Sequence, residues 1–131
     1  MIRITLTATI LVAGTLIPAT SSSAQTLRAW CGSNAHLLEH APDIRETFPD
    51  APVMVRVSCC ESKGDPTAVS RTGDYGLGQV NWRAWARTLR AEGIAQQPAD
   101  LLDPDAGIAA MRLVYDTQGL RAWKPSRRCW S

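Results

Sequence analysis

The chain has 131 residues, of which 45% are hydrophobic and 20% charged, with a formal net charge of +2. This length limits the chain to one domain with one modest core. The near-neutral charge argues against nucleic acid as the main partner, because nucleic-acid binders concentrate positive charge.

The first 24 residues resemble a secretory signal peptide. Arg3 supplies a positive start, residues 4–17 form a largely apolar run, and small residues at 22–24 suit a signal peptidase. The run is too short and too interrupted for a comfortable membrane span, with an uncleaved anchor as the alternative. Cleavage removes one cation and leaves residues 25–131, with a net charge of +1, as one domain. We therefore expect export to the periplasm or the extracellular space and no stable membrane span after cleavage.

Two helices are predicted in the first half of this domain. The first covers about 34–47, with Ser33 as its cap, and Pro42 breaks it or starts a second turn. Its apolar side holds Leu37, Leu38 and Ile44. The second covers 52–62, with Asp50 as its N-cap, and forms the central buried helix. Its core side holds Val53, Met54, Val57 and Cys60.

The second half begins with turn chemistry and continues with two more helices. Residues 63–80 are rich in glycine and predict a loop or short hairpin. Asn81 is expected to cap a helix over 82–92, and another helix starts at Asp103-Pro104 and closes at Gly119. The core side of this last helix holds Ile108, Met111, Val114 and Tyr115. The predicted fold is therefore mainly α, with one short loop or hairpin segment.

An even number of cysteines in a small exported domain indicates two disulfides. The four are Cys31, Cys59, Cys60 and Cys129. A bond between the adjacent Cys59 and Cys60 would be strained, which leaves two pairings, and both tie this segment to the two chain ends. Zinc ligation is the disfavoured alternative, because the spacing is not that of a zinc site. His36 and His40 have helical spacing but lack a third ligand nearby, so we predict neither a metal nor a cofactor.

Glu61 closes the central apolar helix and is the leading candidate for catalysis. Partial burial there would disfavour its charged form and raise its pKa. A raised pKa is what a general acid needs in order to hold a proton near neutral pH. The alternative is a surface glutamate that faces solvent at the helix end.

The glycine-rich segment 72–81 follows Glu61 and offers groups that suit a sugar chain. Its glycines would let the backbone approach a bulky ligand closely. Hydrogen-bonding groups come from Asp74, Gln79 and Asn81, and flat apolar faces from Tyr75, Trp82 and Trp85. A phosphate-binding loop is disfavoured, since no Walker lysine and no preceding strand are present. A purely structural turn remains the other interpretation.

Three aromatic residues and three cations near the C-terminus also allow two interpretations. Tyr115, Trp123 and Trp130 either line a groove or pack in the core. Lys124, Arg127 and Arg128 either hold an anionic cell wall or form a solvated surface.

The ordered motifs resemble the soluble lytic transglycosylase and lysozyme-like superfamily. The stretches CESKGDPTAV at 60–69 and DYGLGQVN at 74–81 are similar to its Glu-Ser-Gly, Asn-Pro-x-Ala-Val and Gly-Leu-Met-Gln-Ile-Asn motifs. The segment from Leu102 to Trp123 resembles the last helix and closing segment of small members. The resemblance covers about residues 48–130.

This resemblance implies roles for individual residues. Glu61 matches the catalytic acid, Ser62 a neighbour that supports the site, and Gln79 a glycan-contacting residue. Asp74 resembles the second carboxylate of c-type lysozymes. Asn81, Tyr75, Tyr115 and Trp123 complete the candidate substrate-binding set. The cysteines resemble those of resuscitation-promoting factors, which implies the pairs Cys60–Cys129 and Cys31–Cys59.

The resemblance implies a monomeric lytic transglycosylase that acts on peptidoglycan and forms a 1,6-anhydro product. The Tyr-Asn-Ala-Gly motif of larger transglycosylases is missing, which leaves the reaction outcome open. A hydrolytic lysozyme that uses Glu61 and Asp74 is the first alternative. A non-catalytic wall-binding protein on the same fold is the second.

Overall fold

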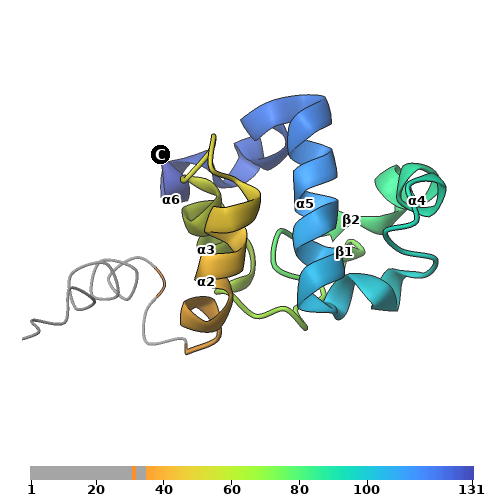
Figure 1. Ribbon diagram of the computed structural model, residues 1–131, viewed down its shortest axis with the longest axis horizontal. Helices are drawn as coiled ribbons and strands as arrows, with labels where there is room; N and C mark the ends of the chain where they lie inside the picture. The colour runs from red at the N-terminus through yellow and green to blue at the C-terminus, as the bar shows by residue number, and fades with distance from the viewer. Residues whose placement is uncertain (1–30, 32–34) are drawn as a thin grey trace, which may run out of the picture.

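The computed structural model describes Cys31 and residues 35–131. Its helices and strands, in chain order, are α2 (Ala35–Thr47), α3 (Met54–Ser62), β1 (Asp74–Tyr75), β2 (Val80–Asn81), α4 (Trp82–Ala91), η1 (Pro98–Leu102), α5 (Pro104–Gln118), η2 (Gly119–Ser126) and α6 (Arg127–Trp130). Helix α5 stands between the α2–α3 pair and a small hairpin followed by α4 (Figure 1). The prediction of a small, mainly helical single domain is confirmed. The predicted signal peptide lies outside the described residues.

Buried residues of α2, α3, the hairpin, α4, η1, α5 and the C-terminal segment form one core cluster. Helix α5 packs against α2 and buries one face in this cluster, as the helical spacing predicted. The buried residues of this face are Ile108, Ala110, Met111 and Val114. Met54 and Met111 are fully buried, as expected of unbranched side chains that fill irregular gaps. Among the described residues, no helix has the length and apolar character needed to cross a membrane.

Helix α2 continues through Pro42, so the predicted break does not occur. Pro42 is exposed, whereas its neighbours Ala41 and Ile44 are buried. The inner face of the helix therefore keeps its packing, which compensates for the backbone hydrogen bond that proline removes. The predicted cap Ser33 and the side chains of Leu37 and Leu38 lie outside the described part of the structure.

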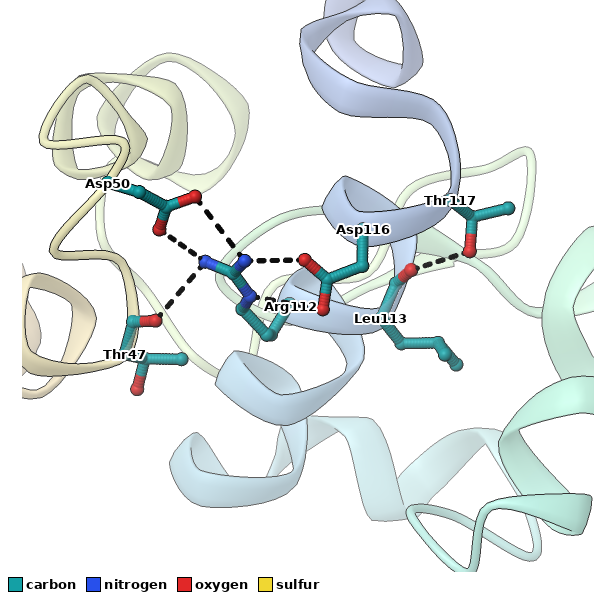
Figure 2. Close-up of polar contacts among 6 residues, drawn as sticks. All are labelled: Thr47, Asp50, Arg112, Leu113, Asp116 and Thr117. Carbon is teal, nitrogen blue, oxygen red and sulfur yellow. Dashed lines mark hydrogen bonds and ion pairs between the residues drawn. The ribbon is translucent and has the colours of Figure 1, made fainter.

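Asp50 does not cap α3, contrary to prediction. The helix starts at Met54 without a side-chain cap, and Asp50 instead pairs with Arg112 of α5. The Arg112 guanidinium also pairs with Asp116 and donates to the Thr47 carbonyl, so it joins α5 to the end of α2 (Figure 2). The same guanidinium lies 5.2 Å from the ring centres of Phe48 and Tyr115. Asp50 is therefore used in tertiary packing.

The predicted cap Asn81 is present, and Asp103, where the last helix was expected to start, also acts as a cap. The Asn81 side chain accepts a hydrogen bond from the Ala84 amide at 3.0 Å and starts α4. The Asp103 carboxylate accepts from two amides of the first turn of α5, both at 3.1 Å. These bonds satisfy amide donors that have no partner within a helix.

Two disulfides join the α3 segment to the two chain ends. Cys31 pairs with Cys59 and Cys60 pairs with Cys129, with Cα separations of 5.2 and 6.0 Å. The pairing implied by the family resemblance is therefore confirmed. The second bond holds the C-terminal segment beside the residue that precedes Glu61.

Candidate active site

The hairpin after α3 is held by contacts with the protein interior. β1 and β2 are antiparallel, with Asp74 opposite Asn81 and Tyr75 opposite Val80. A Cβ atom at Gly76 would lie 2.2 Å from the Leu101 carbonyl oxygen, and one at Gly78 would lie 2.3 Å from Met111. These two glycines therefore allow the turn to pack against η1 and α5. Contacts with the protein interior therefore account for both glycines, and the expected close approach to a ligand stays a prediction.

Two serines fix the end of α3 to this turn. The hydroxyls of Ser58 and Ser62 lie 3.0 and 2.9 Å from the Leu77 carbonyl oxygen. Ser62 is only 7% exposed and also accepts from the Gly64 amide. Lys63 and Gly64 then reverse the chain with positive φ angles of 59° and 74°. This arrangement sets the position of Glu61 relative to the hairpin, and Ser62 fits the supporting role that the resemblance implies.

A cleft of about 550 Å³ lies where α3, the hairpin and η2 meet. A smaller hollow of about 140 Å³ shares four of its lining residues and extends toward Trp85 of α4. The lining of the cleft is Glu61, Ser70, Thr72, Asp74, Gln79, Ala122, Trp123, Pro125 and Ser126. Its volume is within the range of small-molecule sites, and its polar lining suits a sugar.

Glu61 is partly buried in the wall of this cleft. Its Oε1 atom accepts a short hydrogen bond from the Ser126 hydroxyl. Burial raises the pKa of Glu61, the Ser126 hydrogen bond partly offsets this rise, and the negative charge of Asp74 adds to it. The surroundings therefore shift Glu61 toward its neutral, proton-bearing form relative to an exposed glutamate, as the sequence position suggested.

Asp74 lines the same cleft but is held in its ionised form. Burial alone would raise its pKa, yet hydrogen bonds from Ser70, Thr72 and Asn81 together lower it. The Ser70 and Thr72 hydroxyls donate to Oδ2, and the Asn81 amide donates to Oδ1 at 2.8 Å. The two carboxyl groups thus have pKa values that their surroundings move in opposite directions. Such a pair can divide the roles of proton donor and negative charge.

Gln79 and Asn81 use their side-chain amides to hold the hairpin. The Gln79 amide nitrogen donates to the carbonyls of Ala68 and Gly76, both at 3.1 Å. Within the described residues no donor reaches the Gln79 amide oxygen, so this oxygen can accept from a ligand in the cleft. Asn81 lines only the smaller hollow, and both ends of its amide are already bonded.

The candidate aromatic residues lie in different places. Trp123 is 4% exposed, lines the cleft and donates through its indole to the Gly78 carbonyl at 2.8 Å. Tyr75 is half-buried and packs against the core. Tyr115 packs edge-on against Phe48, with ring centres 5.7 Å apart, and does not line the cleft. Core packing therefore accounts for Tyr75 and Tyr115, and Trp123 is the aromatic wall of the site.

Sequence reasoning missed Ser126, which contacts Glu61 directly. Its hydroxyl lies 3.1 Å from the Trp123 carbonyl and accepts from the Trp130 indole at 3.0 Å. The disulfide pairing was the sequence signal that could have identified Ser126. Because Cys60 adjoins Glu61, its bond to Cys129 places the preceding turn, which contains Ser126, beside the glutamate. Ser126 is therefore a positioning residue for the candidate acid.

We expect Ser126→Ala to raise the pKa of Glu61 further, because the variant loses the hydrogen bond that lowers it. The alkaline limb of the activity profile should move to higher pH, and kcat/KM should fall roughly tenfold as the carboxyl loses its orientation. Thr117→Ala is the matched control, because that hydroxyl donates to Leu113 within α5 (Figure 2) and Thr117 does not line the cleft. If Ser126→Ala leaves the pH profile of activity unchanged, Ser126 does not position the Glu61 carboxyl.

Glu61, with a raised pKa, and Asp74, with a lowered pKa, line one cleft, and paired carboxyl groups of this kind occur in lysozyme-type sites. The family model for the transglycosylase SLT domain matches residues 49–118, and the chain belongs to this family. The resemblance noted in the sequence is thereby confirmed, and at family level the function is lytic transglycosylase-type action on peptidoglycan. Searches of curated proteins and of solved structures gave no match.

Proposed function

We propose that this protein is an exported lytic transglycosylase that cuts the β-1,4 bond between N-acetylmuramic acid and N-acetylglucosamine. The observation that carries the proposal is the Glu61 carboxyl, which lines the cleft and has a raised pKa. Family membership supports peptidoglycan as the substrate. SLT domains usually act in the periplasm or outside the cell, which agrees with the predicted signal peptide.

In the proposed reaction Glu61 acts first as an acid and then as a base. It donates its proton to the glycosidic oxygen, the bond to C1 of the muramic acid breaks, and the N-acetylglucosamine end leaves as an alcohol. The 6-hydroxyl of the same muramic acid then attacks C1 and returns its proton to the Glu61 carboxylate. The product is a 1,6-anhydro sugar, and no water is consumed.

Asp74 would stabilise the positive charge that develops at C1 during this reaction. Its ionised state favours this electrostatic role. Oδ2 accepts from two hydroxyls and Oδ1 from one amide, so the hairpin holds the charged carboxylate in a fixed position. The transglycosylase reaction needs no second nucleophile, so this electrostatic role is sufficient for it.

The hydrolytic alternative is kept because Asp74 shares the cleft with Glu61. Mass analysis of the muropeptides separates the two reactions, since an anhydro end is one water lighter than a reducing end. We expect anhydro ends from the wild type. Reducing ends would establish the lysozyme reaction, and no cleavage at all would favour the wall-binding module.

We expect Asp74→Asn to reduce cleavage by less than roughly a hundredfold and to leave the products as anhydro sugars. Asparagine keeps an acceptor oxygen for the hairpin but removes the charge. The matched control is Asp65→Asn, which removes a carboxylate bonded to Thr67 in the same loop, outside the cleft. Complete loss of activity in a folded Asp74→Asn protein, with the Asp65 control active, would favour the hydrolytic role.

A further inference from the structure

A second hollow of about 400 Å³ lies beside the cleft and combines cations with apolar surface. Leu120 and the buried Trp130 supply the apolar part. The cations are Arg121, Lys124 and Arg127, and all three are exposed. We call this feature the basic pocket. It includes Lys124 and Arg127 of the three cations noted in the sequence, adds Arg121, and is not lined by Arg128.

Among the described residues, no acidic side chain forms an ion pair with a cation of the basic pocket. The ion pairs of Arg112 with Asp50 and Asp116 lie elsewhere in the fold. Arg121 donates to the Gln118 carbonyl at 3.3 Å and gains no acidic partner. Three positive charges around an apolar surface therefore favour a ligand that is both anionic and partly apolar.

The basic pocket and the cleft share one stretch of chain. Pro125 and Ser126 line the cleft, whereas Lys124 and Arg127 line the basic pocket. Neighbouring Cα atoms are about 3.8 Å apart, so residues two apart are separated by no more than about 8 Å. The Trp130 indole in the pocket also donates to the Ser126 hydroxyl, which contacts Glu61. A ligand in the basic pocket would thus lie close to the candidate acid.

We propose that the basic pocket binds carboxylates of the peptide stem carried by the muramic acid in the cleft, an inference that rests on the proposed function. The stem leaves the sugar through a lactyl group, combines small apolar residues with several carboxylates, and extends by about 3.3–3.6 Å per residue. It can therefore reach the pocket within a few residues. The apolar surface formed by Leu120 and Trp130 favours a peptide over a purely phosphate-based wall polymer.

Cleavage of matched substrates tests this assignment. The two substrates are soluble glycan chains that keep their peptide stems and the same chains after an amidase has removed the stems. The test variant is Lys124→Gln/Arg127→Gln, and the control is Arg83→Gln/Arg87→Gln, which removes two exposed charges from α4. Binding to a phosphate-rich wall polymer is measured in parallel.

We expect the wild type to prefer stem-bearing chains and the Lys124→Gln/Arg127→Gln variant to lose about fivefold in kcat/KM on them, mainly through KM. The same variant should match the wild type on stripped chains, and the α4 control should match it on both. An equal loss on both substrates, or the same loss in the α4 control, would overturn the assignment. If the variant loses only its binding to the phosphate-rich wall polymer, the assignment is also overturned. If the wild type cleaves neither substrate, the proposed function itself fails, whereas equal cleavage of both defeats only the stem site.

Discussion

Glu61→Gln is expected to lower the rate of glycan cleavage by roughly a thousandfold, which is within the range that a positioned general acid contributes. Glutamine keeps an acceptor for the Ser126 hydroxyl but has no proton to donate to the glycosidic oxygen. Release of soluble muropeptides from purified sacculi measures the loss. Glu46→Gln, an exposed glutamate of α2, is the matched control and should retain full activity.

The fold of Glu61→Gln should be intact. Because the folded-state pKa of Glu61 is raised, its contribution to stability is present below the pKa of the unfolded chain and is lost as the pH rises through the folded value. Glutamine does not ionise, so the variant avoids this loss of stability. It should therefore be at least as stable as the wild type near neutral pH. If the inactive variant melts well below the wild type, unfolding explains its inactivity; if it retains activity, Glu61 is not the acid.

Removal of the Cys60–Cys129 disulfide should cost about 4 kcal/mol of folding free energy. The bond closes a loop with a sequence separation of 69, and the estimate follows from the loop entropy that the bond removes from the unfolded chain. Activity should also fall, because the bond holds the Ser126 turn beside Glu61. Denaturant unfolding and sacculus digestion of Cys60→Ala/Cys129→Ala measure the two effects.

The second disulfide provides the control for this experiment. Cys31→Ala/Cys59→Ala opens a loop with a separation of 28 and should also destabilise the domain. It should leave activity per folded molecule nearly unchanged, because neither cysteine lines the cleft. Equal specific activity in the two double variants would show that the Cys60–Cys129 bond has no part in positioning the site.

Much of the fold was predictable because its signals are local. The caps Asn81 and Asp103, the buried face of α5 and the turn at 63–80 follow from patterns within a few residues. Asp50 was misassigned because its partner Arg112 is distant in the chain. Pro42 was misjudged because the packing around it outweighs one lost backbone bond. Both errors arise where tertiary contacts override local preference.

The part of the candidate site that lies within the sequence motifs was predictable. Glu61 and Asp74 come together on one cleft with pKa values shifted in opposite directions. Tyr115 shares α5 with Val114 and Gln118, which line the smaller hollow, and spacing alone does not reveal that its ring faces Phe48. Ser126 belongs to no motif, and the Cys60–Cys129 bond is the sequence feature that ties its turn to Glu61. The wall that η2 contributes to the cleft could likewise not be predicted, and neither could the basic pocket. Both depend on how the C-terminal segment folds back.

The proton on Glu61 can be measured by carbon NMR titration of its side-chain carboxyl in the intact protein, beside the pH dependence of kcat/KM. We predict a pKa above the ordinary glutamate value of 4.5, with activity declining as the pH rises through that same pKa. A carboxyl that titrates at or below the ordinary value, in an enzyme whose activity does not follow it, would contradict the assignment of Glu61 as the proton donor.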